Sequence, residues 1–335
     1  MGRLKEFVNS YKKNEDIRCF EALERDVKGL IEYASGLVYN IENAKAEHIT
    51  SFVWRVLEKD PVFLDYMILE ATTTPKPTTD IEDYVSAKSL NVLLYAIKVG
   101  RFLNYNEDSL KELGIAAFLH DTGLLKLEGD VRNRLYKKGE IPDNERGEIN
   151  RHTEYGKNIA KKIGFDDSIA NIICQTHSKL NKQIAEAALI IGACDRFDAS
   201  VSPRDDRKKP SFKEKMEYIE KGYSESGRRI TNAVMGALGF YSIGEVIRIG
   251  SFGDGIVIGV SGKEMNGGIM SPFVFMPIKR YNSGQRVSAY ELDFSKDGLS
   301  YQISGSIDDV TKKKGLIIFL KEYSSSSGVN NIGYR

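Results

Sequence analysis

The sequence predicts a mainly α protein with an all-helical core, a helical N-terminal region and a small C-terminal β domain. Apolar residues recur at helical spacing from about residue 16 to residue 71, as in Leu37 and Val38, and again from residue 81 to residue 238. After Gly239, short runs rich in β-branched and aromatic residues alternate with Gly, Asn, Asp and Ser, as is typical of strands and turns. This change of periodicity separates the helical regions from the β domain.

These patterns divide the chain into four expected segments. Residues 1–80 form the helical N-terminal region, 81–238 the helical domain and 239–322 the β domain. Two prolines and a run of threonines between residues 72 and 80 disfavour helix and predict a linker before the helical domain. The serine-rich residues 323–335 have the composition of a flexible tail.

The composition limits the classes of partner. The 335 residues are 41% hydrophobic and 28% charged, which excludes disorder as the main state and provides apolar material for two or three domains. Lys and Arg number 48 against 47 Asp and Glu, so the chain has no overall positive field that would attract a nucleic-acid polymer or an anionic membrane. We therefore expect neither of these partners.

The apolar runs and the cysteines predict a cytoplasmic protein. The longest apolar run, near residues 185–194, is shorter than the roughly 18 residues of a membrane span, and the N-terminus lacks the apolar core of a signal peptide. Cys19, Cys174 and Cys194 are odd in number and widely spaced, which predicts free thiols and not a disulfide framework or a thiolate metal site.

Histidines are scarce, and their placement indicates chemistry. The chain has four histidines, and three of them, His120, His152 and His177, lie in the helical domain. A His beside an Asp at a helix end can bind a divalent ion, although a hydrogen-bonded histidine at a buried helix terminus explains the same pattern. Asp195 lies on an apolar helix and therefore needs a cation, a metal or several donors, a salt bridge being the simplest of these.

Five short motifs follow one another along the helical domain. They are HDTG at 120–123, LYKKGEI at 135–141, the H-x-x-x-G of His152 and Gly156, QTH at 175–177 and ACDRFDA at 193–199. Their order resembles the HD-GYP branch of the HD-domain metal-dependent phosphohydrolases, whose typical members hydrolyse the bacterial messenger cyclic di-GMP. The resemblance covers about residues 81–238 and implies an HD-domain-like helical core.

The resemblance also implies the roles of individual residues. His120 and Asp121 would be catalytic, and Arg204 and Arg207 would hold substrate phosphates, with solvated surface arginines as the alternative. The metal would be iron or manganese, and its ligands would be His120, Asp121, His152, His177 and Asp195.

Two expected metal ligands are replaced. Lys88, in KSLNV, occupies the position of a metal-binding His, and Thr176 occupies the position of a second His beside His177. Leu124 replaces a lysine, and no Gly-Tyr-Pro follows His177. Lys88 and Thr176 are therefore altered ligand positions, and a lysine ammonium cannot ligate a metal.

Three ligands remain at each of two metal positions. One position keeps His120, Asp121 and Asp195, and the other keeps Asp121, His152 and His177. Water could complete either position, so one or two ions are expected unless the ammonium of Lys88 satisfies Asp121 and Asp195 without metal. We expect Lys88 to project into the same pocket.

Three functions compete at this point. The first is a cyclic di-GMP-linked signalling protein on a degenerate HD-GYP scaffold, which binds a nucleotide or a protein partner, through its N-terminal or β domain, with weak or no catalysis. The second is an active metal-dependent phosphodiesterase acting on cyclic di-GMP or another nucleotide. The third, a purely structural helical protein, does not explain why the histidines gather in one series of motifs.

Overall fold

The computed structural model describes most of the helical region and parts of the β region. It describes residues 19–73, 80–136, 142–177, 184–201, 212–220, 225–239, 241–250, 253–264, 270–279, 288–294, 303–307 and 316. Most of the predicted linker, residues 74–79, and the predicted tail, residues 323–335, lie outside these ranges. No helix among the described residues is both long enough and apolar enough to cross a membrane.

The chain folds into two units, and the predicted mainly α class is confirmed. One unit comprises residues 30–59 and 74–237, and the other comprises residues 1–29, 60–73 and 238–335. The N-terminal region of residues 1–80 is thus divided between the two units, which differs from the predicted separate segment. The reason is that helix α4 (Pro61–Thr73) packs against strand β2 (Gly253–Glu264). Helical periodicity predicts a helix but not the element against which the helix packs.

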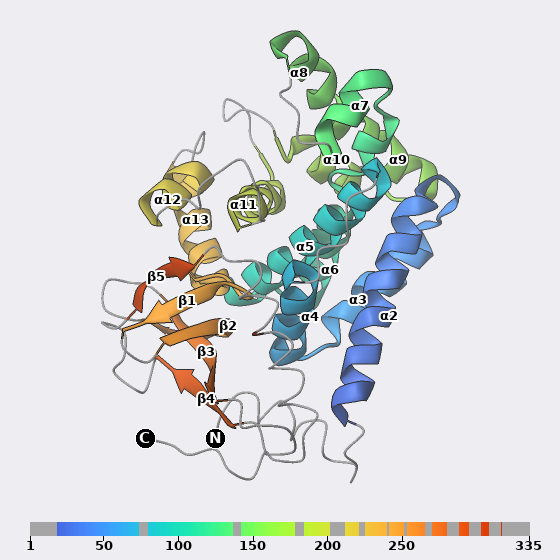
Figure 1. Cartoon of the computed structure of the whole chain (residues 1–335). Helices are drawn as coiled ribbons and strands as arrows, with labels where there is room; N and C mark the ends of the chain where they lie inside the picture. Colours follow the sequence, from blue (N-terminus) through green and yellow to red (C-terminus); the bar gives the residue numbers. More distant parts are fainter. Residues whose placement is uncertain are drawn as a thin grey trace. The chain divides into compact units, whose positions relative to one another are not determined.

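Every described element between residues 81 and 238 is helical, as the periodicity predicts (Figure 1). The helices of the chain are α2 (Cys19–Tyr39), α3 (Ala46–Leu57), α4, α5 (Ile81–Phe102), α6 (Glu107–Leu119), α7 (Gly129–Tyr136), α8 (Asp143–Asn150), α9 (His152–Ile163), α10 (Asp167–Gln175), α11 (Glu186–Val201), α12 (Phe212–Glu220) and α13 (Glu225–Leu238), with short 3-10 turns η1 (Ile41–Asn43) and η2 (Thr122–Lys126).

The buried helix α5 is the centre of the larger unit. It packs against α6, η2 and α11, while α9 packs against η2 and α10. The side chain of Asp80 caps the start of α5 by accepting a hydrogen bond from the Asp83 amide at 2.8 Å. These contacts bring the end of α6 and the start of α9 close to the middle of α5 and α11.

A glycine ends α9 and an aspartate begins the next helix, α10. Gly164 ends α9 in the left-handed conformation, with φ of 108°, which glycine adopts without strain. The side chain of Asp166 caps α10 by accepting from the amides of Ser168 and Ile169 at 3.1 and 3.2 Å.

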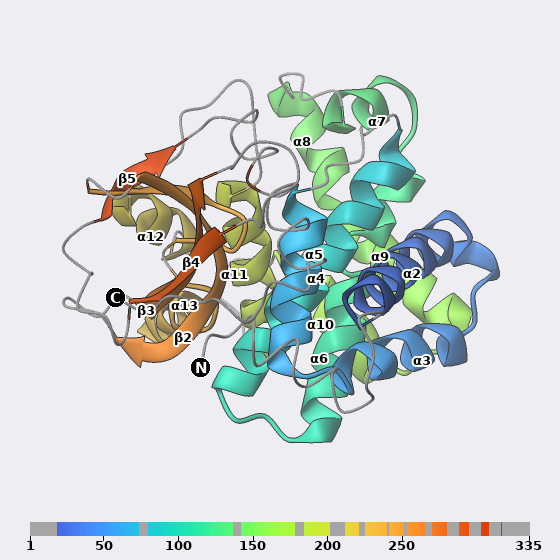
Figure 2. The same cartoon turned by 60° about the horizontal axis from the view of Figure 1, so that its bottom comes forward.

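The described strands of the second unit form one antiparallel sheet in the order β4-β3-β2-β1-β5. The strands are β1 (Val246–Ile249), β2, β3 (Met270–Lys279), β4 (Ser288–Asp293) and β5 (Ile303–Ile307). The sheet curves, most visibly along β2, where its pairing with β3 is irregular (Figure 2). Its core includes Ile247, Val257, Val274 and Phe294.

Candidate metal centre

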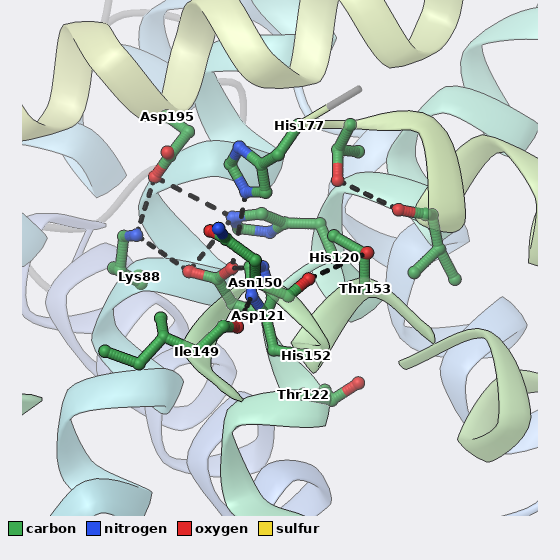
Figure 3. Close-up of polar contacts among 12 residues, drawn as sticks. Lys88, His120, Asp121, Thr122, Ile149, Asn150, His152, Thr153, His177 and Asp195 are labelled. Carbon is green, nitrogen blue, oxygen red and sulfur yellow. Dashed lines mark hydrogen bonds and ion pairs between the residues drawn. The ribbon is translucent and has the colours of Figure 1, made fainter. Parts of the chain in front are cut away.

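The candidate site lies in the larger unit, where the ends of several helices meet. Figure 3 shows the three imidazole rings and the Lys88 ammonium gathered around the carboxylate of Asp121. The residues are Lys88 in α5, His120 at the end of α6, Asp121 at the start of η2, His152 at the start of α9, His177 just after α10 and Asp195 in α11.

Asp121 is the centre of the cluster, and its two oxygens face different groups. Oδ1 lies 3.3 Å from Nε2 of His152 and 3.9 Å from Nε2 of His177. Oδ2 lies 2.7 Å from Nζ of Lys88 and 3.3 Å from Nε2 of His120. The Asp121 side chain is 2% exposed, so both oxygens depend on these partners and not on water.

Lys88 lies in the pocket, as predicted, and binds both acidic residues. Its Nζ lies 2.7 Å from Oδ2 of Asp121 and 2.7 Å from Oδ1 of Asp195. Burial alone would lower the pKa of the Lys88 ammonium, but the two carboxylates outweigh burial and raise this pKa well above its ordinary value. The side chain therefore carries a positive charge at neutral pH.

The backbone fixes the orientation of two imidazole rings. Nδ1 of His120 lies 2.8 Å from the carbonyl oxygen of Ala117, and Nδ1 of His152 lies 2.6 Å from that of Ile149. A carbonyl oxygen only accepts, so each Nδ1 carries a proton and each Nε2 points toward the carboxylates. Among the described residues, both Nε2 atoms are buried without a hydrogen-bond partner, as expected of metal-ligating histidines.

The charge of His120 depends on its acidic neighbours. Burial lowers the pKa of this imidazole, but Asp121 more than offsets the effect, and the pKa is raised to about 10. The pKa of the Asp121 carboxyl is held well below its ordinary range, against the effect of burial, by His120 and Lys88. Without a metal, therefore, His120 holds a proton that an ion on that side would have to displace.

The ligand atoms form two groups that share Asp121. One group contains Asp121, His152 and His177, and the other contains His120, Asp121 and Asp195. Within each group all ligand atoms lie within 4.8 Å of one another, so the residues present fit a divalent ion. The structure thus brings together all five residues that the sequence motifs single out. An ion held there would polarise a phosphate oxygen and activate a water molecule.

Residues 85–200 match the family model described as HD domain. This segment of the chain is similar to HD domains. The matched segment includes Lys88 and all five ligand-type residues, which agrees with the resemblance that the motifs indicate.

A more distant likeness points to one branch of HD-domain proteins. The chain is 23% identical over 195 residues to a cyclic di-GMP phosphodiesterase of Pseudomonas aeruginosa, and the match covers 55% of this chain. It covers 46% of that protein, so the chain spans about half the length of this relative. This likeness is consistent with an HD domain of the HD-GYP type. No solved structure matches the chain significantly.

Thr176, at which the resemblance implies a replaced ligand, lies at the C-terminal end of α10. Its side chain is buried, and its hydroxyl donates a hydrogen bond to the carbonyl oxygen of Ile173 at 2.9 Å. The hydroxyl therefore closes the last turn of α10. The cysteines that the structure describes in detail, Cys174 and Cys194, are free thiols, as predicted.

Two residues beside the site, the buried Asp198 and the half-buried Tyr84, are not among the residues that the motifs single out. Asp198 lies one turn after Asp195 on α11, accepts a hydrogen bond from Nδ2 of Asn91 at 2.9 Å, and has its pKa raised by burial to about 6. The Tyr84 ring centroid lies 5.8 Å from Nζ of Lys88. Spacing is the signal for both, because residues three or four apart on a helix share a face.

The predicted phosphate-binding residues Arg204 and Arg207 lie outside the described residues. The same holds for residues 137–141 of the LYKKGEI motif and for residues 178–183, where the Gly-Tyr-Pro would follow. The roles of these segments stay predictions.

Proposed function

We propose that this HD domain is the ligand-binding part of a cyclic di-GMP-linked signalling protein, in which hydrolysis is weak or absent. Support for the nucleotide comes from the Pseudomonas aeruginosa relative, which is a cyclic di-GMP phosphodiesterase. Related nucleotides have the same phosphodiester chemistry and belong to the same proposal. The remaining parts of the chain would pass the bound state to a protein partner, and we propose that the protein acts in the cytoplasm.

One observation carries the proposal of weak hydrolysis, namely the position of the Lys88 ammonium. Its Nζ lies 2.7 Å from oxygens of Asp121 and Asp195, two of the three groups that would hold one of the ions. In two-metal sites the pair of ions stabilises both the attacking and the leaving oxygen. A lysine brings positive charge but offers no coordination site for water or for the leaving group, so we expect the chemical step to be slow.

The donor set also guides the choice of metal. Imidazole nitrogens together with carboxylate oxygens suit iron or manganese, and each group of three ligands leaves positions for water. We propose one or two ions of iron or manganese, with His120, Asp121, His152, His177 and Asp195 as the candidate ligands and Arg204 and Arg207 as candidate contacts to the nucleotide phosphates.

An active phosphodiesterase is the second candidate function. The convergence of five ligand-type residues into two groups favours it, because the atoms of each group lie close enough together to hold a metal ion. If the protein is an active phosphodiesterase, His120 and Asp121 are catalytic, and Lys88 lowers the rate of hydrolysis without abolishing hydrolysis.

The two candidates differ in turnover, and one preparation tests both. The protein is purified without oxygen or chelator, its metal content is measured, and the sample is divided for calorimetric titration with cyclic di-GMP and for chromatographic detection of hydrolysis. Saturable binding with turnover below one event per hour supports the signalling function. Fast, metal-dependent turnover supports the enzyme, and a sample that neither binds nor hydrolyses cyclic di-GMP contradicts both.

A further inference from the structure

We propose that the HD domain holds a single divalent ion, bound by Asp121, His152 and His177, and that the Lys88 ammonium replaces a second ion on the other side of Asp121. The inference rests on the proposed function and specifies the metal site within it. It follows from a difference between the two groups of ligands, because Lys88 contacts Asp195 and the oxygen of Asp121 that faces Asp195, and not the oxygen that faces His152 and His177.

On the Lys88 side, the ammonium occupies the space between Asp121 and Asp195 where an ion would lie. Nζ lies 2.7 Å from both Oδ2 of Asp121 and Oδ1 of Asp195, and Nε2 of His120 faces the same two oxygens at 3.3 and 3.9 Å. A transition-metal ion bonded to both oxygens would lie about 2.0–2.2 Å from each, in the gap that Nζ fills. The ammonium and the ion therefore exclude one another.

The structure also holds Lys88 in this position. The side chain extends from α5 and is 18% exposed, so its charge is largely removed from water. If the ammonium moved away, the carboxylates of Asp121 and Asp195 would face each other with one positive partner fewer. The ammonium thus forms internal ion pairs with two acidic side chains. Moving the ammonium away would separate this largely buried charge from both carboxylates.

On the other side of Asp121, Lys88 makes no ion pair with the ligand atoms of this group that the structure describes. Oδ1 of Asp121 makes its ion-pair contacts with Nε2 of His152 and Nε2 of His177. The Nδ1 contact of His152 with the carbonyl oxygen of Ile149 keeps its Nε2 directed at this oxygen. The His177 side chain is 31% exposed, so water has access to this side and can complete the coordination of an ion.

The test counts ions in the whole 335-residue chain. Each variant is loaded with Mn²⁺, unbound metal is removed, the ions per chain are measured by elemental analysis, and electron paramagnetic resonance distinguishes an isolated Mn²⁺ from an exchange-coupled pair. The wild type should hold one isolated ion. His152→Ala should lower the count toward zero, whereas Asp195→Asn, which removes a carboxylate of the Lys88 group and none of the three proposed ligands, should leave it at one.

The decisive variant removes the ammonium. Lys88→Met keeps the length of the side chain without its charge and should raise the count to two coupled ions, while the control Lys88→Arg keeps the charge and should stay at one. Circular dichroism checks the fold of each variant, and Lys88→Gln provides the same comparison if Lys88→Met does not fold.

Several results would overturn the single-ion site. They are two ions or none in the wild type, one ion in folded Lys88→Met or Lys88→Gln, and a loss of metal in Asp195→Asn equal to that in His152→Ala. Cyclic di-GMP binding on the same samples separates the two proposals. Binding with a count other than one overturns only the single-ion site, and one ion without binding overturns only the proposed function.

Discussion

Gly123 and His152 lie so close together that no side chain fits between them. A Cβ atom added to Gly123 would lie 1.8 Å from the carbonyl oxygen of His152 and 2.5 Å from the amide nitrogen of Gly156. The absence of a side chain at Gly123 therefore allows the turn that carries Asp121 to rest on the first turn of α9. This approach places the Asp121 carboxylate beside the His152 ring, at 3.3 Å from Nε2.

Gly123→Ala should disrupt this contact. The added methyl group meets backbone atoms, which cannot rotate away as a side chain can, so η2 and α9 must move apart. We expect a loss of about 2 kcal/mol or more in the free energy of unfolding, as for overpacked sites in general, and weaker Mn²⁺ binding. Urea unfolding and titration with Mn²⁺ measure the two effects.

Gly147→Ala in α8 is the matched control. An added Cβ there meets no atom within 4 Å, and alanine favours helix over glycine by about 1 kcal/mol. The control should therefore be neutral or slightly stabilising and should bind metal as the wild type does. Equal stability of Gly123→Ala and Gly147→Ala would contradict the role given to this close approach.

The N-cap of α10 gives a second stability prediction. The Asp166 carboxylate accepts from two amides at the start of the helix that leads to His177, so Asp166→Ala should cost about 1 kcal/mol. The adjacent Asp167→Ala removes an exposed ion pair with Lys161, which water screens, and should cost clearly less than Asp166→Ala. Equal losses in thermal or urea unfolding would show that the cap does not stabilise α10.

Much of this architecture is readable from the sequence because its causes are local. Periodicity predicts the helices, Gly164 and Asp166 mark a stop and a start, and the H-x-x-x-G spacing of His152 and Gly156 marks the surface that η2 approaches. The motif order identifies residues that the structure brings together. The same motif order predicts Lys88 in the pocket, where the structure pairs it with two acidic side chains, as a buried lysine requires.

Other features depend on packing and cannot be read in this way. Helix α4 is apolar on several sides, and its place beside β2 follows from tertiary contacts and not from its periodicity. The hydrogen bond between Asp198 and Asn91 also depends on tertiary packing, because it joins residues 107 positions apart. A sequence pattern gives the helix face on which Asp198 lies, but not the helix that faces it.

Asp198 should make stability depend on pH between about 4 and 6. Burial raises the pKa of its carboxyl to about 6, above the value of about 3.9 in an unfolded chain, so the folded protein holds the proton over this range. Because the folded state then binds more protons than the unfolded state, the contribution of Asp198 to stability falls as the pH rises through this range. The difference of about two pKa units corresponds to at most about 3 kcal/mol.

Asp198→Asn isolates this effect, because the amide keeps the oxygen that accepts from Asn91 and does not titrate. Lys88, Asp195 and His120 also act on Asp198, and they are present in both proteins. The free energy of unfolding of the variant minus that of the wild type should therefore grow from pH 4 to pH 7 by up to about 3 kcal/mol. A difference that stays constant with pH would mean that Asp198 is ionised throughout.

The effect of Lys88→His on turnover tests whether the altered ligand position limits catalysis. Histidine adds a neutral imidazole ligand where Lys88 stands and removes a positive charge that repels an ion at His120, Asp121 and Asp195. We expect higher metal content than in the wild type and at least tenfold faster hydrolysis of cyclic di-GMP.

Lys88→Met, which removes the charge without adding a ligand, should gain metal but bind it more weakly than Lys88→His. Metal analysis and turnover at a series of Mn²⁺ concentrations separate these effects. If wild type and Lys88→His contain equal metal and hydrolyse at equal rates, Lys88 does not stand in for an ion, and a wild type that is already fast would favour the enzyme over the signalling protein.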